Sequence, residues 1–223
     1  MKIDATGSIL WQKTYGGADD DFPFFIQQTS DGGYIVAGNT MSFGLGSTDA
    51  WALKLDSTGN ISWQKTYGGT ADEDCRSVRQ TADGGYILGG YTRSYGAGDA
   101  DVWMIKLDST GNISWQKTYG DTGYDSGQFI QQTIDGGFII TGSTSSFGSG
   151  NNDFLILKIN STGNMHSSCT FISDSSASPI DSTASAADTT ISLISSTAAA
   201  TNTNVSSVNG TGIDSPICES QSS

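Results

Sequence analysis

Hydrophobic and polar residues alternate along much of the first 165 residues of the chain. In ISWQKTY (61–67), Ile61, Trp63 and Tyr67 fall on one side, whereas Ser, Gln and Thr fall on the other. This period of two is typical of a half-buried β-strand. DVWMIKLD (101–108) is almost continuously apolar, which predicts a strand covered on both faces. No stretch shows the period of an amphipathic helix, so the pattern predicts an all-β chain.

The same pattern returns every 52 residues. Trp11, Trp63 and Trp115 are separated by this interval, and KLDSTGNISWQKTYG occurs letter for letter at 54–68 and 106–120. A looser copy opens the chain and a truncated copy begins at residue 158. Three full units are therefore expected, starting at residues 11, 63 and 115, after an N-terminal part-unit.

Each unit contains four strand signals separated by turns. In the second unit these are ISWQKTY (61–67), CRSVRQT (75–81), GYILGGYT (85–92) and DVWMIKLD (101–108). The Asp-Gly-Gly sequence at 83–85 marks a tight turn, because glycine accepts positive φ angles. Four short antiparallel strands and one tryptophan per repeat are typical of a β-propeller blade. The predicted fold is therefore all-β, with three four-stranded propeller blades and a part-blade.

The units resemble a known group of repeats. They follow the form W-x-K-T-Y-G-G, D-G-G-Y-I and D-x-W-x-x-K-L-D, which is similar to tandem-repeat β-propeller proteins of bacterial and archaeal surfaces. LDSTGNISW (55–63) also resembles, with one residue fewer, the L-D-x-x-T-G-x-x-x-W signature of quinoprotein-like (PQQ-type) propellers. The resemblance implies a propeller of a secreted or surface protein. It implies no particular activity.

Composition divides the chain into two regions. All ten Lys and Arg residues lie in 1–165, the repeat array, whereas 166–223 is dominated by Ser, Thr and Ala. In this tail, Asp174, Asp181 and Asp188 are seven residues apart, and apolar residues recur on a similar beat. A coiled coil is rejected, because Ser, Thr and Asn are poor helix formers. The tail is expected to be extended or disordered.

Three units are too few to close a propeller, which needs about 4 to 8 blades. Either the chain is the C-terminal fragment of a larger propeller whose remaining blades complete the ring, or a second copy of the chain supplies them. The first alternative is favoured, because Met1 aligns with Leu53 and Ile105 inside a unit. A signal peptide is then expected upstream of Met1, and the location is expected to be extracellular or at the cell surface.

The net charge of −13 restricts the partners. Phosphate groups would be repelled, so nucleic acid and anionic membrane surfaces are disfavoured. No apolar run approaches the roughly 18 residues that span a bilayer. The expected partner is a polysaccharide or another protein.

No catalytic signature is present. The single histidine is His166, glutamate occurs only at Glu73 and Glu219, and Cys75 is not repeated and is expected to fill a strand position. The chain is therefore expected to be a non-enzymatic structural or binding module whose blade loops meet the partner. The alternative is a propeller hydrolase or lyase that acts on glycans through Asp residues and Ca²⁺.

Acidic, glycine-bent loops are the candidate metal sites. Asp49, Asp101 and Asp153 end equivalent loops of the three units. Loops rich in oxygen ligands suit Ca²⁺, which is the one cofactor considered. The competing interpretation is that these loops are solvated connections in which Asp residues cap turns.

One aromatic position recurs in the loops, at Phe43, Tyr95 and Phe147. Aromatic rings beside polar loops suit the recognition of sugars or peptides, so these residues are the candidate ligand-binding set. The competing interpretation is that the rings pack beneath the loops and cover the core.

Two cysteines flank the tail. Cys169 and Cys218 form a candidate disulfide if the protein is exported, since disulfides persist in oxidising compartments. Cys75 would then remain reduced.

Overall fold

The computed structural model describes residues 1–148, 150–165, 172–174, 180–181 and 185–188 of the chain. Every regular element in these residues is a β-strand, and the named strands pair only with antiparallel neighbours. The prediction of an all-β chain is confirmed. No helix in this part of the chain is long and apolar enough to cross a membrane.

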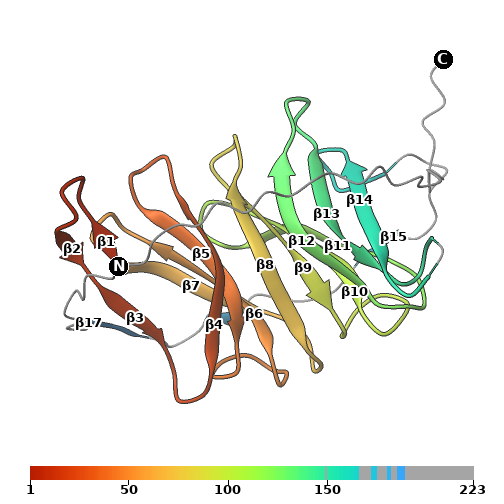
Figure 1. The fold of residues 1–223 in the computed structure, drawn as a ribbon, viewed down its shortest axis with the longest axis horizontal. Coiled ribbons are helices and arrows are strands. Elements are labelled where there is room, and N and C mark those ends of the chain that lie inside the picture. Colours follow the sequence, from red (N-terminus) through yellow and green to blue (C-terminus); the bar gives the residue numbers. More distant parts are fainter. Residues whose placement is uncertain (149, 166–171, 175–179, 182–184, 189–223) are drawn as a thin grey trace, which may run out of the picture.

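Three sheets stand beside one another in a row (Figure 1), and the strands of each follow chain order. The first contains β4 (Asp21–Gln28), β5 (Tyr34–Thr40), β6 (Asp49–Leu55) and β7 (Ile61–Tyr67). The second contains β8 (Glu73–Gln80), β9 (Tyr86–Thr92), β10 (Asp101–Leu107) and β11 (Ile113–Tyr119). The third contains three strands, β12 (Asp125–Gln132), β13 (Phe138–Thr144) and β14 (Asp153–Ile159).

The remaining strands come from the two ends of the described sequence. At the N-terminus, β1 (Lys2–Ile3) and β2 (Ile9–Trp11) form a hairpin, followed by β3 (Lys13–Gly16). Three short tail strands each add to an outer strand of the array: β15 (Ile172–Asp174) to β11, β16 (Ile180–Asp181) to β7, and β17 (Ser185–Asp188) to β3. The tail is thus extended where it is described.

The tryptophan-bearing strand is the fourth strand of each of the first two sheets. In the first sheet β7 pairs with β6, so that Lys54 lies opposite Trp63. The short turn at 56–60 makes this pairing necessary, because consecutive antiparallel strands joined by a tight turn form a hairpin. The first two sheets therefore span 21–67 and 73–119, a frame that starts ten residues after Trp11 and Trp63.

The turn in the repeated stretch has the structure that its residues predict. Asp56 Oδ1 accepts hydrogen bonds from the backbone N–H of Thr58 and of Asn60, at 2.8 and 2.9 Å. Gly59 has a φ of 80°, which L-residues other than glycine rarely adopt. The same arrangement recurs around Asp108. The aspartate and the glycine therefore stabilise this turn in both copies of the stretch.

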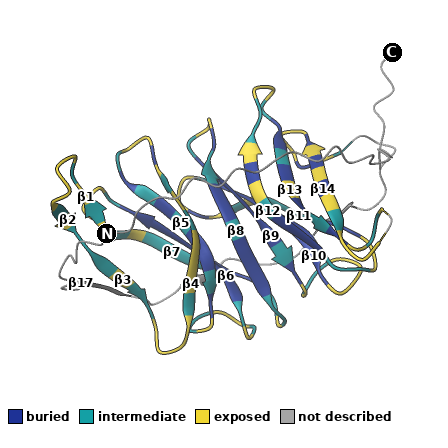
Figure 2. Cartoon of the chain, in the orientation of Figure 1, coloured by how far each residue is buried: buried dark blue, intermediate teal, exposed yellow. Residues whose placement is uncertain are grey.

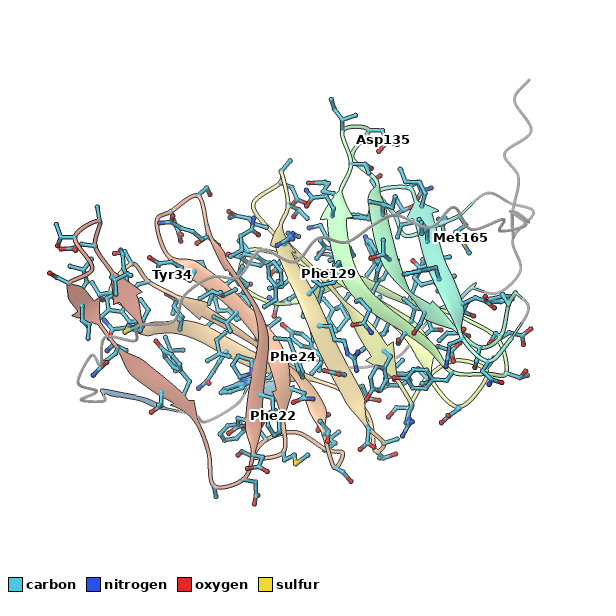
Figure 3. The ribbon with its side chains drawn as sticks, in the orientation of Figure 1. Phe22, Phe24, Tyr34, Phe129, Asp135 and Met165 are labelled. Carbon is cyan, nitrogen blue, oxygen red and sulfur yellow. The ribbon has the colours of Figure 1, made fainter. Side chains whose placement is uncertain are left out.

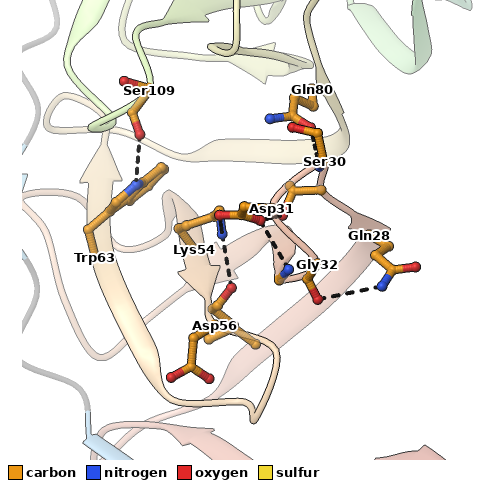
Figure 4. A network of polar contacts seen from close by, with 12 residues as sticks. Gln28, Ser30, Asp31, Gly32, Lys54, Asp56, Trp63, Gln80 and Ser109 are labelled. Carbon is orange, nitrogen blue, oxygen red and sulfur yellow. Dashed lines mark hydrogen bonds and ion pairs between the residues drawn. The ribbon is translucent and has the colours of Figure 1, made fainter.

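Neighbouring sheets pack face to face. β8 packs against β4, β5 and β6, and β12 packs in the same way against β8, β9 and β10. Trp63 lies between the first two sheets, and its Nε1 donates to the carbonyl of Ser109 at 3.2 Å (Figure 4). Trp115 donates equivalently to Ser161. Each of these tryptophans therefore joins its own sheet to a turn of the next unit.

A repeated ion pair fixes the Asp-Gly-Gly turn at the edge of each sheet. Lys54 Nζ lies 2.8 Å from Asp31 Oδ2 and donates to the carbonyl of Leu55 at 3.0 Å. Lys106 with Asp83 and Lys158 with Asp135 repeat the pair. The turns of neighbouring sheets are also joined, because the N–H of Ser30 donates to Gln80 Oε1 at 2.8 Å (Figure 4).

Burial shows where the row is covered (Figure 2). All seven residues of β10 are buried, as predicted for a strand covered on both faces. In β14, the equivalent strand of the third sheet, buried and more exposed residues alternate. β4, at the other end, is largely exposed. Within the described residues the sheets thus form a row that is open at both ends, and no closed ring is seen.

Candidate functional site

The predicted calcium-binding aspartates lie at the starts of equivalent strands. Asp49 opens β6 and Asp101 opens β10, and both are buried. Asp49 Oδ2 accepts a hydrogen bond from the N–H of Gly46, and Asp101 Oδ2 accepts one from Ala97, both at 2.9 Å. Asp153 opens β14 and is only partly buried. Each of the two buried carboxylates therefore holds the loop that precedes its strand.

A second buried carboxylate from the next sheet approaches each of them. A Cβ atom on Gly68 would lie 1.8 Å from Asp49 Oδ1 and 2.6 Å from Glu73 Oε2. The equivalent atom on Gly120 would lie 2.2 Å from Asp101 Oδ1 and 2.6 Å from an oxygen of Asp125. Only glycine leaves room for two carboxylates to converge at these junctions. The sequence did not reveal these pairs, because their members come from different units.

The second carboxylates are also held by hydrogen bonds. Glu73 Oε2 accepts from the N–H of Gly69 at 2.7 Å, and its Oε1 accepts from Thr92 Oγ1 at 2.8 Å. Asp125 Oδ2 accepts from Ser146 Oγ at 2.6 Å. The loop before its own strand and a hydroxyl group of its own sheet therefore hold Glu73, and a hydroxyl group after β13 of its own sheet holds Asp125.

Burial changes the acidity of the first carboxylates. Burial raises the pKa of Asp49 to about 6. The charge of Glu73 acts in the same direction, whereas the hydrogen bond from Gly46 acts in the opposite direction. Burial likewise raises the pKa of Asp101 to about 6, with reinforcement from Asp125. A buried carboxylate beside another is expected to retain its proton to a higher pH than an exposed one.

The contacts of these groups support turn capping. Among the residues that the structure describes, no three or more His, Cys, Asp or Glu side chains are grouped so that they could hold a metal ion. Ca²⁺ usually takes about six to eight oxygen ligands, more than one carboxylate pair provides. Calcium binding at Asp49, Asp101 and Asp153 therefore stays a prediction.

The carboxylate pairs predict that the free energy of unfolding contains a contribution that falls as the pH rises. An acid whose folded-state pKa is raised from 3.8 to about 6 binds more protons in the folded chain, so its contribution to stability falls as the pH rises through that window. Asp49→Asn with Asp101→Asn keeps one oxygen acceptor at each site and removes the group whose titration causes this loss. Relative to wild type, the variant should gain roughly 1 to 3 kcal/mol per site between pH 4 and pH 8, measured by urea unfolding.

Asp31→Asn is the matched control. Its pKa is lowered, chiefly by the hydrogen bond from Lys54, so its contribution is present above the unfolded pKa and is lost on acidification. The difference in free energy of unfolding between Asp31→Asn and wild type should therefore be constant between pH 5 and pH 8. A double variant whose stability relative to wild type is also constant from pH 4 to pH 8 would show that Asp49 and Asp101 are ordinary surface-like acids.

The candidate ligand-binding rings are partly buried. The ring of Tyr95 lies 5.9 Å from that of Trp103, centroid to centroid, and its hydroxyl donates to the carbonyl of Gly68 at 3.0 Å. The ring of Phe43 lies 5.6 Å from that of Trp51. These contacts agree with packing beneath the loops. Phe147 is also partly buried, and ligand binding by the three residues stays a prediction.

The cysteines and the histidine add no reactive centre that the structure describes. Cys75 lies buried in β8, as predicted for a strand position, and burial raises the pKa of its thiol. His166, Cys169 and Cys218 lie outside the described residues, and so does the candidate disulfide.

The two open ends of the row expose large apolar residues that the sequence did not single out (Figure 3). At the β4 end, a groove of about 430 Å³ lies between the N-terminal strands and the first sheet. Its lining includes Trp11, Phe24, Ile26 and Tyr34. At the other end, Phe129, Phe154 and Ile156 are exposed on the third sheet.

Comparison with known proteins adds no assignment. No protein-family model matches the chain, and no curated protein matches it in sequence. The resemblance to propeller repeats therefore rests on the repeated motifs alone. Function has to be inferred from the geometry of this chain, and its most distinctive features are the two open ends.

Proposed function

We propose that the chain is a non-enzymatic scaffold that joins a second copy of itself to form a closed β-propeller. Its loops would then be presented to a polysaccharide or protein partner outside the cell or at its surface. One observation carries the proposal. In the described residues, β3 at one end of the row lacks the three inner strands of a sheet, and the sheet β12–β14 at the other end lacks its fourth, outer strand.

β3 occupies the position of an outer strand. The sequence WQKTYG at 11–16, which includes β3, recurs at 63–68 in and after β7 and at 115–120 in and after β11. Trp11 Nε1 donates to the carbonyl of Ser57 at 3.2 Å, and Tyr15 Oη donates to Gly59 at 2.7 Å. Trp63 and Tyr67 make the same two bonds to the next sheet. In the described residues, however, β3 pairs only with β17 and has no inner strands beside it.

The third sheet has the inner strands but, in the described residues, lacks the outer strand. β14 is the last strand of its sheet in the described residues, although its equivalents β6 and β10 each pair with a tryptophan strand. The face beside that edge is also bare. Phe154 is 95% exposed and Ile156 is 64% exposed, whereas the equivalent Val102 and Met104 are fully buried against the next sheet.

The two deficits are complementary. The sheet β12–β14 of one copy would fill the groove in front of β4, and its β14 edge would pair with β3 of the other copy. The internal junctions show the same contact already formed: Val78 and Ile130 are buried against the preceding sheet, whereas their equivalent Ile26 is exposed. Each copy holds two complete sheets and contributes to two shared ones, so two copies give six four-stranded sheets.

A ring of six lies within the range of about 4 to 8 blades of known propellers. The two junctions would be equivalent under two-fold symmetry, which closes the assembly and prevents open filaments. The similarity of the repeats to those of bacterial and archaeal surface proteins supports the proposed location. The repeated loops, with Phe43, Tyr95 and Phe147, would lie at equivalent positions around the ring.

Disulfide trapping tests the shared sheet. In the complete sheets Ala52 lies opposite Lys65 and Met104 opposite Lys117, so the equivalent pair across copies is Ile156 with Lys13. Opposite residues of antiparallel strands lie about 4.5–5.5 Å apart, within disulfide reach. Mixing the single variants Ile156→Cys and Lys13→Cys under mild oxidation should give a covalent dimer linked between positions 13 and 156, identified by peptide mapping.

Ile134→Cys is the control partner, because Ile134 is fully exposed in a turn away from this edge. It should give no specific link to position 13. Equal cross-linking of both pairs, or none of either, would rule out the shared sheet.

A further inference from the structure

The tail contributes one strand to each outer strand of the array, in reverse order along the row. β15 lies on β11, β16 on β7 and β17 on β3, each antiparallel. The free edge of an outer strand carries unpaired N–H and C=O groups, which readily accept another strand. The tail therefore occupies the edge that would otherwise be open on each of these strands.

The register of the three pairings is the same. Asp174 lies opposite Lys117, Asp181 opposite Lys65, and Asp188 opposite Lys13. The lysines recur every 52 residues and the aspartates every seven. Although these two spacings differ, an aspartate lies opposite a lysine in all three pairings. A slip of one residue would set an aspartate opposite Gln or Thr in each pairing. The shared register thus places an acidic residue and a basic residue at directly opposite ladder positions in all three pairings.

The spacing of the aspartates fits the spacing of the sheets. Seven extended residues span about 23 Å, and sheets that pack face to face are about 10 Å apart. A seven-residue step along an extended chain is therefore longer than the separation of two sheets that pack face to face. The charge balance fits as well, because residues 166–223 contain five acidic residues and no Lys or Arg.

We propose that the edges of β3, β7 and β11 form a binding site for an extended peptide with an acidic residue every seven positions. Its occupants are the three described tail strands, β15, β16 and β17. In this role these three strands act as a strap along the outer strands of the array, with backbone pairing for affinity and the Asp–Lys positions for register. The site does not depend on a second copy of the chain.

Hydrogen exchange on the full chain, followed by mass spectrometry, tests the strap. Asp174→Lys with Asp181→Lys and Asp188→Lys sets like charges across all three ladders. Backbone amides in peptides covering β3, β7 and β11 should then exchange about tenfold faster, because like charges directly opposite each other destabilise strand pairing. Lys13→Asp with Lys65→Asp and Lys117→Asp should have the same effect from the other side.

Combining both sets reverses every pair and should restore exchange to within about twofold of wild type, since opposite charges again face each other. The control is Asp19→Lys with Asp20→Lys and Asp99→Lys, which changes the net charge equally at exposed loop positions. It should leave the three strands protected. Unchanged exchange in both triple variants, or no recovery in the combined variant, would overturn the proposal.

Discussion

Gly90→Ala is expected to lower the free energy of unfolding by about 3 kcal/mol or more, because it forces a backbone clash inside the central sheet. Gly90 on β9 faces a bulge in β8, where the register shifts between Cys75 and Ser77. A Cβ atom at Gly90 would lie 1.8 Å from the carbonyl oxygen of Asp74. That oxygen belongs to the backbone and cannot move aside as a side chain would.

The strand has little room to adjust. Glycine also stands at the equivalent positions 38 and 142, where a Cβ would lie 1.9 Å from the carbonyl oxygens of Phe22 and Ser126. The bulge and its glycine thus form one repeated structural element. Urea unfolding followed by circular dichroism should show the loss as a lower midpoint with an unchanged slope.

Gly84→Ala is the matched control for this prediction. Gly84 has a φ of 81°, but a Cβ atom added there would meet no neighbouring atom within 4 Å. Only conformational strain of about 1 kcal/mol is therefore expected. If Gly90→Ala destabilises the protein no more than Gly84→Ala does, the close approach at the bulge is not a constraint on the fold.

Met104→Asp is expected to abolish the folded state, whereas Ile156→Asp leaves it intact. The two residues are equivalent in the repeat, but Met104 is fully buried between the second and third sheets and Ile156 is 64% exposed. An unpaired carboxylate in an apolar interface costs several kcal/mol, about the whole stability of a small domain. At an exposed position the same change costs roughly 0.5 kcal/mol or less.

The second effect of Ile156→Asp is on assembly. The residue lies on the face that the proposed second copy covers, so the variant should remain folded but become monomeric in light scattering. Ile134→Asp, at an exposed turn, should remain folded and assembled. Similar melting curves for Met104→Asp and Ile156→Asp would show that the internal junction is not the apolar interface described above.

Local features of the fold could be predicted from the sequence because each depends on neighbouring residues. Alternation in ISWQKTY gives a strand, and Asp56 with Gly59 gives the turn before it. The frame of the sheets could not be predicted in the same way. A 52-residue period repeats equally well from any starting point, and only the pairing of β7 with β6 shows where a sheet ends.

Features that join distant residues were also hidden. Asp49 could be seen as an acidic loop residue, but its partner Glu73 lies in the next sheet and is not repeated as glutamate. The seven-residue spacing of the tail aspartates can be read from the sequence. The pairing of Asp181 with Lys65 cannot, because the two residues are far apart in the chain. Such contacts depend on how sheets stack and how strands register, which periodicity within one segment does not encode.

The mass of the native chain in solution tests the central claim most directly. Light scattering coupled to gel filtration, at total concentrations from about 1 to 100 µM, separates a closed assembly from a monomer or a filament by its concentration dependence. The proposed ring predicts twice the mass of one chain, constant over the upper part of this range. A single-chain mass throughout, or a mass that keeps rising with concentration, would contradict it.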